Sequence, residues 1–260
     1  MNTKSFWKKG SPFFLLITLV ILWEAASVIF KIEAWLLPSP SAILKEGIAD
    51  YSRISEHLGS TVFLSLIGLL IGSTIGIVLA SCLHLFPNVK NAVYPLLILS
   101  QNVPIIVLAP LLVIWFGFGL LPKIIVISLV CFFPVAVALL DGFRQTPYEL
   151  KHYFEMMGAN KRQLFWKLEL PHALPFLFSG LKISATYSVM GAVISEWLGA
   201  QNGIGVYMTY ASSSFRTDRV FVAIFIIMAL SLLFFACISL LERYFISWKR
   251  REDKERNVRN

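Results

Sequence analysis

Residues 59–85 read GSTVFLSLIGLLIGSTIGIVLASCLHL and decide the fold class of this chain. The stretch contains no Asp, Glu, Lys or Arg. About 20 consecutive apolar residues are enough for an α-helix to cross the hydrocarbon core of a bilayer. A backbone in lipid must satisfy its own hydrogen bonds, and the period-two alternation of a membrane β-barrel is absent. The stretch therefore predicts a transmembrane helix.

Five further apolar stretches flank this one, one before it and four after it. The six predicted spans are Pro12–Phe30, Gly59–Leu85, Ala92–Phe118, Leu120–Leu140, Leu174–Leu198 and Val220–Ile246. The first resembles a signal peptide because lysines precede it, but Trp23 and Glu24 continue the helix beyond an ordinary signal core, so an uncleaved span is our prediction. We expect an all-α integral membrane protein, with a six-helix domain (12–246) between a short N-terminus (1–11) and a basic tail (247–260).

The composition agrees with a membrane protein. Of the 260 residues, 57% are hydrophobic and 15% are charged, whereas a soluble domain has about a quarter charged residues. Six spans leave little room for a soluble catalytic domain. The three cysteines lie inside apolar runs and the four histidines are scattered, so we expect no metal site and no catalytic residue.

The net charge of +8 raises the question of nucleic acid, but in a membrane protein the distribution of Lys and Arg reports orientation. Sixteen of the 23 Lys and Arg fall on the side of the N-terminus, and six fall on the other side; Lys182 lies within a span. This asymmetry predicts that both termini and the loop 142–172 are cytosolic, and that the chain meets lipid rather than nucleic acid.

The third stretch is interrupted by Gln101-Asn102-Val103-Pro104. A proline frees backbone groups, and amide side chains are costly where they face lipid. A polar pathway, which we favour, and a buried structural kink both explain such an interruption. The candidate pathway residues are Gln101, Asn102, Pro104, Tyr187, Ser188 and Glu196. Because Glu196 lies near the outer end of its span, it can instead pair with a neighbouring helix.

Small residues recur at spacing four in the second span, at Gly68, Gly72, Gly76 and Ala80. Such a stripe lets another helix approach the backbone closely. We expect this contact within the bundle rather than between subunits.

The loop 142–172 begins with a helix signal. In Thr146-Pro147-Tyr148-Glu149, Thr146 is the expected cap and Pro147 the expected first helical residue. Leu150, Tyr153, Phe154 and Met157 then give one apolar face at helical spacing. Gly158 follows, where a left-handed helix end favours glycine.

A second helix signal follows at once. Asn160 and Gln163 predict its start, and Pro171 is expected to end it. The loop is therefore predicted to be a short helical hairpin. Because helices this short are marginal in water, the hairpin must pack on something. The residues alone leave two candidates open, the lipid headgroups and another protein.

The spacing from Gly158, through nine residues, to Leu168-Glu169-Leu170-Pro171 resembles the G-x9-I-x-L-P half of the EAA signature of bacterial ABC-importer permeases. The sequence GANKRQLFWKLELPHALP (158–175) is similar to the branch that imports nitrate, sulfonates, taurine and thiamine precursors. The resemblance covers roughly residues 35–240 and extends to LPSP at 37–40, WFG at 115–117 and SEWLGA at 195–200. One departure is that His152-Tyr153-Phe154 stands where the EAA triplet belongs.

The resemblance implies a type I ABC-importer permease fold whose hairpin, between transmembrane helices 4 and 5, is the coupling element on an ATPase. The coupling residues it implies are His152, Glu155, Gly158, Ala159, Arg162, Leu168, Leu170 and Pro171. It also implies an ABC ATPase subunit, an extracytoplasmic binding protein and a second permease copy, as a homodimer, in the inner membrane of a bacterium. Since the chain has no GxxxxGK[ST] phosphate loop, we expect it to bind no cofactor and ATP to lie on the partner.

The function that follows from the resemblance is that of a non-catalytic permease subunit of an ATP-driven importer for a small polar or anionic solute. That solute is of the nitrate, sulfonate or taurine type, or of the pyrimidine or thiamine-precursor type. The sequence Ala185-Thr186-Tyr187-Ser188 is slightly more similar to the permeases for the second type. The alternatives are a secondary carrier, which usually has inverted repeats, and a membrane enzyme, which needs intramembrane clusters of ionisable residues. The sequence displays neither pattern.

Overall fold

The computed structural model describes residues 3–246, with side chains from residue 14 onward. Within this part every regular element is a helix, as predicted. The elements are α1 (Thr3–Ile29), α2 (Pro40–Ala49), α3 (Tyr51–Leu85), α4 (Pro87–Ser100), α5 (Ile105–Phe116), α6 (Leu120–Arg144), α7 (Tyr148–Met156), α8 (Lys161–Leu164), the π-helical turn η1 (Phe165–Glu169), α9 (Leu170–Glu196), α10 (Ile204–Ser213) and α11 (Thr217–Phe245). The predicted tail, 247–260, lies outside the described residues.

Within residues 3–246, four helical segments have the length and hydropathy of a membrane span. They are Tyr51–Leu85, Leu120–Arg144, Lys161–Glu196 and Thr217–Phe245, and they correspond to the second, fourth, fifth and sixth predicted spans. The bent pair α4 and α5 adds a fifth crossing when it is taken as one broken span. The first predicted span corresponds to a shorter apolar helical stretch, Phe14–Ile29.

The third predicted span, Ala92–Phe118, is not one continuous helix. Helices α4 and α5 meet at an angle of 98°. Pro104 has no N–H and disfavours helical backbone at the residue before it, so α4 ends at Ser100 and α5 starts at Ile105. The four residues between them are exposed in the isolated chain.

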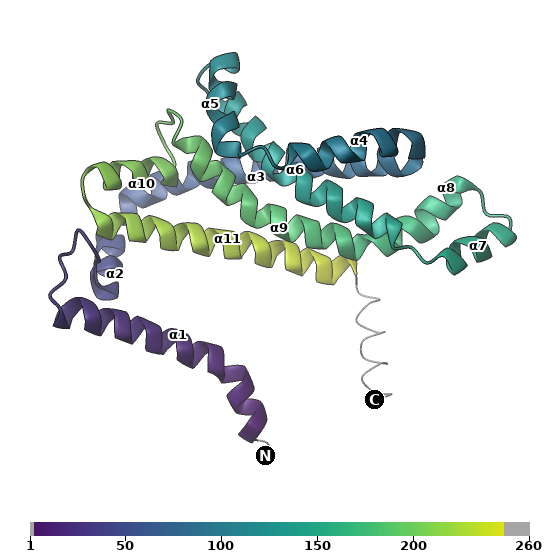
Figure 1. Cartoon of the computed structure of the whole chain (residues 1–260). Helices are drawn as coiled ribbons and strands as arrows, with labels where there is room; N and C mark the ends of the chain where they lie inside the picture. The colour runs from purple at the N-terminus through teal and green to yellow at the C-terminus, as the bar shows by residue number, and fades with distance from the viewer. Residues whose placement is uncertain (1–2, 247–260) are drawn as a thin grey trace.

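Helices α3, α6 and α9 form the centre of the bundle, and α11 runs beside α9 (Figure 1). The small residues of α3 face α6 and are buried. A Cβ atom added at Gly72 would lie 2.4 Å from the Ser128 carbonyl oxygen, and one added at Gly76 would lie 2.9 Å from that of Phe132. These contacts confirm that the stripe packs within the bundle.

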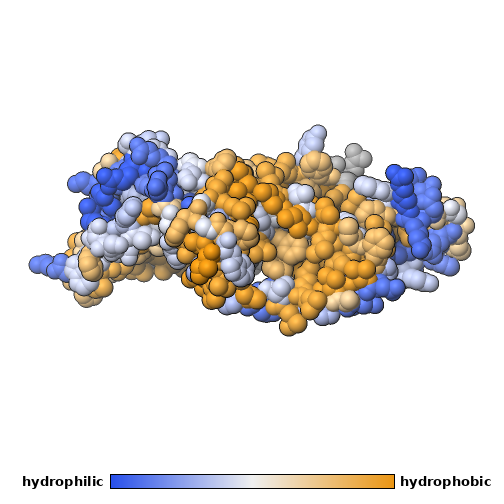
Figure 2. Space-filling view, turned by 90° about the horizontal axis from the view of Figure 1, so that it is seen from above, coloured by the Kyte–Doolittle hydropathy of each residue, from blue (hydrophilic) through white to orange (hydrophobic). Residues whose placement is uncertain are grey.

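The face of the molecule seen in Figure 2 has an apolar middle and two polar ends. Hydrophobic residues cover the middle, and hydrophilic residues gather at both ends (Figure 2). Helices α7 and α8 protrude at one end, whereas α2 and α10 lie at the opposite end (Figure 1). An apolar belt between two polar ends is the surface expected of a bundle that crosses a bilayer.

Replacing Gly72 by alanine should destabilise the bundle. The new methyl group would meet the α6 backbone at Ser128, and such overpacking costs about 1–3 kcal/mol. The measurement is the unfolding temperature of the purified protein in detergent. Gly59→Ala, also in α3, is the matched control because its Cβ would have no neighbour within 4 Å. Equal unfolding temperatures for the two variants would contradict the packing argument.

Candidate functional site

The hairpin that joins α6 to α9 is built around a glycine turn. Helix α7 ends at Met156, and Gly158 has a φ of +80°, in the left-handed region that favours glycine. The Ala159 N–H donates to the Phe154 carbonyl at 3.0 Å and closes the helix end. This confirms the predicted left-handed end, and it leaves the space around the Gly158 Cα open.

The start of the second arm also follows the prediction. The Gln163 N–H donates to the Asn160 side chain at 2.8 Å, and the Asn160 N–H donates to the Gln163 side chain at 2.9 Å. This reciprocal pair is a capping box, which satisfies two backbone donors at the helix start. The turn between the two arms is therefore fixed by local hydrogen bonds.

Two details of the hairpin differ from the prediction. Thr146 does not cap α7: the N-cap is Pro147, no side chain caps the helix, and the buried Thr146 hydroxyl has no hydrogen-bond partner. Pro171 does not end the second arm, because α8, η1 and α9 run on as one helical segment, Lys161–Glu196. The Leu170 N–H donates to the Phe165 carbonyl, and this wider turn accommodates a proline that has no N–H of its own.

The predicted coupling residues divide into two groups. His152, Glu155, Gly158 and Arg162 are exposed, whereas Ala159, Leu168, Leu170 and Pro171 are partly buried. Large apolar side chains add to the exposed group, namely Tyr148, Leu150, Tyr153, Met156, Met157 and Trp166. Helix α7 has no fully buried residue, and apart from the half-buried Phe154 its apolar face is exposed within the described chain.

A buried carboxylate that the sequence analysis did not single out lies where the hairpin joins the bundle. Glu169 is 6% exposed. It accepts a hydrogen bond from His84 Nε2 at 2.7 Å and forms an ion pair with Lys151, whose Nζ lies 2.6 Å from its Oε1. The three residues come from η1, α3 and α7. The only sequence signal was a single acidic residue among the basic and apolar residues of the second arm.

The predicted pathway residues are not brought together in one place. Gln101, Asn102 and Pro104 are exposed at the break between α4 and α5. Tyr187 on α9 is 42% exposed, but its neighbour Ser188 is fully buried, and its hydroxyl donates to the Ala185 carbonyl. Ser188 therefore lies inside the helix packing rather than on a surface.

Glu196 pairs with neighbouring elements, the alternative that the sequence left open. Its carboxylate accepts from the Thr61 hydroxyl at 2.7 Å and from the Gly205 N–H at 2.8 Å. The same Thr61 oxygen accepts from the Ile204 N–H at 2.8 Å. Glu196 thus caps the start of α10, where a negative charge is favourable, and holds α10 to α3. Gly203 makes room for it, since a Cβ there would lie 2.1 Å from the Glu196 carboxyl carbon.

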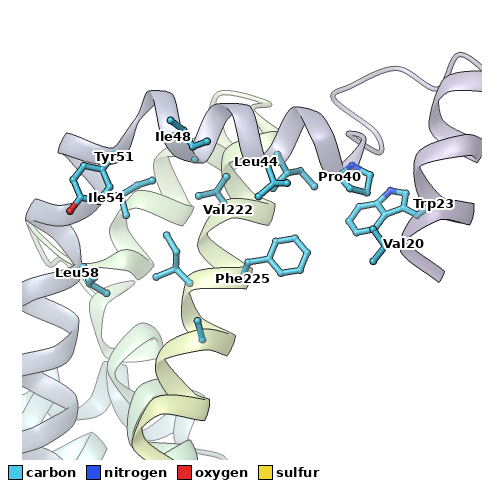
Figure 3. Close-up of a pocket in the computed structure, with 14 residues that line it drawn as sticks. Val20, Trp23, Pro40, Leu44, Ile48, Tyr51, Ile54, Leu58, Val222 and Phe225 are labelled. Carbon is cyan, nitrogen blue, oxygen red and sulfur yellow. The ribbon is translucent and has the colours of Figure 1, made fainter. Parts of the chain in front are cut away.

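Two surface hollows differ in chemistry. One of about 580 Å³ lies between α1, α2, α3 and α11, and its lining, which includes Trp23, Leu44, Ile48, Val222 and Phe225, is apolar (Figure 3). It suits hydrocarbon rather than a polar solute.

The other hollow, of about 460 Å³, lies beside α10 and has a polar lining that includes Arg53, His57, Asn202 and Arg216. Tyr207 also lines it and donates from its hydroxyl to Asp50 at 3.1 Å. Burial and the Asp50 carboxylate raise the pKa of Tyr207. This hollow is the more suitable of the two for a polar solute or a polar partner.

Comparison with known proteins gives consistent matches. A family model described as "Binding-protein-dependent transport system inner membrane component" matches residues 72–247. The formylaminopyrimidine transport permease protein of Halalkalibacterium halodurans is 37% identical over 93% of this chain and 96% of its own length. The riboflavin transport system permease protein of Chloroflexus aurantiacus is 30% identical over 92% and 90%. A solved amino acid ABC transporter chain has the same fold, with a TM-score of 0.63 at 16% identity, over 78% of this chain and 98% of that one.

Replacing Glu196 by alanine should lower the free energy of unfolding. The Gly205 N–H and the Thr61 hydroxyl would lose their buried acceptor, and an unsatisfied buried group costs about 1–3 kcal/mol. The measurement is thermal unfolding in detergent, with Glu56→Ala as control because Glu56 is exposed on the same helix as Thr61. If the two variants unfold at the same temperature, the network does not stabilise this end.

Proposed function

This chain belongs to the family of binding-protein-dependent transport system inner membrane components, and from that premise we propose how it works as the permease subunit of an ABC importer. Two copies form the membrane part. Separate ATPase chains bind and hydrolyse ATP on the cytosolic side, and an extracytoplasmic binding protein delivers the solute. The observation that carries this proposal is the capped hairpin with an uncovered apolar face.

The hairpin supports an ATPase rather than lipid as its partner. Its exposed face combines aromatic and methionine side chains with the charged groups of Glu155 and Arg162. Aromatic residues, Met and Arg are enriched at protein interfaces. The capping box and the Gly158 turn fix the shape of this face before any partner binds, which reduces the entropy lost on docking.

The covalent continuity of the hairpin with the bundle supports a coupling role. Its second arm runs without a break into α9, and its first arm starts shortly after α6 ends at Arg144. Helices α6 and α9 pack directly on each other. When ATP draws two ATPase subunits together, a docked hairpin moves with them and carries this helix pair between inward-open and outward-open states. ATP biases these states only through its different affinity for each.

The orientation follows from the charge asymmetry described above. The end with α7 and α8 is cytosolic, as are both termini, and the end with α2 and α10 faces the binding protein. The chain lies in the inner membrane of a bacterium. The exposed break at Gln101, Asn102 and Pro104 contributes to the pathway, together with Tyr187, because polar groups and free backbone are tolerated only where a cavity or protein surrounds them.

The solute is a small nitrogen heterocycle of the pyrimidine type. Support comes from the two relatives at 30% identity or above that are named for formylaminopyrimidine and riboflavin transport. A sulfonate or taurine is the alternative, since a taurine transport permease of Escherichia coli is 28% identical to this chain.

Replacing Gly158 by valine should uncouple ATP hydrolysis from uptake. A branched residue in a left-handed conformation costs about 1–2 kcal/mol, so the turn that presents the coupling face would distort. The measurement is ATP-driven uptake of formylaminopyrimidine, with taurine as a second solute, into vesicles that hold the ATPase and the binding protein. Gly158→Asn is the control, because asparagine tolerates this conformation. Unchanged uptake by the valine variant would refute the role of the hairpin.

Thiol labelling should report opposite sides for the two ends. In a variant without the native cysteines, Lys161→Cys in α8 should react with a membrane-impermeant reagent only in inside-out vesicles. Ser214→Cys, after α10, should react only in intact spheroplasts. Labelling of the α8 position from outside would overturn the orientation and, with it, docking to a cytosolic ATPase.

A further inference from the structure

Glu169 lies where the hairpin joins the bundle, and it contacts both of them through Lys151 and His84. We propose that Glu169 is a positioning residue: it fixes the hairpin to α3 and α9, so that hairpin movement is transmitted to the bundle and ATP hydrolysis stays coupled to transport. This inference rests on the proposed function, because it assumes that the ATPase docks on the hairpin.

Glu169 ties together three segments that are far apart in the sequence. Its Oε1 atom forms an ion pair with Lys151 on α7, and its Oε2 atom accepts a hydrogen bond from His84 near the end of α3. The His84 ring is itself held, because it stacks on Phe143 of α6 with ring centroids 4.3 Å apart and an interplanar angle of 17°. One carboxylate therefore links the first arm of the hairpin to two helices of the bundle.

The direction of the Glu169 side chain depends on the π-helical turn. In η1 the Leu170 N–H donates five residues back, to Phe165, so this turn contains one residue more than an α-helical turn. Each residue turns an α-helix by about 100°, so the extra residue re-aims Glu169 relative to the rest of α9. Phe165, at the start of the turn, is buried in the same core as Phe143. Single π-turns of this kind frequently occur at functional sites.

The ion pair between Lys151 and Glu169 is shielded from water. The Glu169 side chain is 8% exposed and that of Lys151 is 25% exposed, so water screens the pair little. Removing one partner of a buried pair is costly because it leaves an uncompensated charge. Helix α7 has two carboxylates of its own, Glu149 and Glu155, but both are exposed and neither forms an ion pair within the described residues. Glu169 is thus the carboxylate that holds this arm.

The first arm, α7, is attached to the rest of the protein through the chain at its ends and through the Lys151–Glu169 pair. Apart from its chain ends, α7 has no buried residue that fixes it to the bundle. Without the Lys151–Glu169 pair, a docked ATPase could displace α7 while α9 stayed in place. ATP would still be hydrolysed, but less of the movement would reach the helices, and the coupling between the two processes would fall.

The test uses the complete complex of permease, ATPase and binding protein in vesicles. The variants are Lys151→Met, which removes the α7 partner, and Glu169→Gln, with Lys151→Arg as the conservative variant. Lys90→Met is the matched control, since Lys90 is a half-buried lysine on α4, like Lys151 on α7, but has no ion pair among the described residues. The readouts are the ATPase rate, the solute taken up per ATP hydrolysed, co-purification of the ATPase, and the unfolding temperature.

We expect solute uptake per ATP to fall about tenfold in Lys151→Met and Glu169→Gln, which corresponds to a coupling loss of the usual size. The ATPase should still co-purify, and Lys151→Arg and Lys90→Met should keep the wild-type ratio. The proposal fails if Lys151→Met keeps the wild-type ratio, if Lys151→Arg loses it equally, or if uptake and ATPase rate fall in parallel. Failure of the wild-type chain to bind an ATPase would instead overturn the proposed function.

Discussion

The close approach of α3, α6 and α9 is the contact on which the other features of this protein depend. In lipid the hydrophobic effect gives no net gain from helix association, so association relies on van der Waals packing and interhelical hydrogen bonds. Gly72 brings α3 against the backbone of α6, and Gly180 does the same for α9. A Cβ atom added at Gly180 would lie 2.7 Å from the Pro134 carbonyl oxygen. The Ser184 hydroxyl adds a hydrogen bond to the Cys131 carbonyl at 2.7 Å. These contacts make the centre of the bundle a closely packed unit.

Two buried carboxylates attach the polar ends to that unit. Glu169 and Glu196 lie near the two ends of the continuous helical segment Lys161–Glu196. Each is hydrogen-bonded to α3, the first through His84 and the second through Thr61. Each also holds an element outside the central bundle, α7 in one case and α10 in the other. Helices α3 and α9 are therefore linked to each other by hydrogen bonds near both ends.

The break between α4 and α5 is the other constraint on how the chain functions. Free backbone groups at membrane depth are tolerated only where protein or a water-filled cavity surrounds them. Gln101 and Asn102 are exposed in the single chain, and the Asn102 side chain donates to the Ile98 carbonyl at 2.9 Å. In the proposed importer, a second permease copy or water in the translocation pathway would surround these residues.

Residues close together in the sequence determined the long helices and the turn of the hairpin. Apolar runs predicted the long helices, Gly158 and the Asn160–Gln163 pair predicted the hairpin turn, and the loop motif indicated the family. Each of these depends on neighbours in the chain. Tertiary structure decided the rest: the 98° bend after Ser100, the π-turn that lets Pro171 lie within a helix, and the burial of Ser188. It also gave Glu169 and Glu196 their roles, because the partners of each carboxylate include a residue of α3 that is 85 or 135 positions away, and no local pattern encodes such pairings.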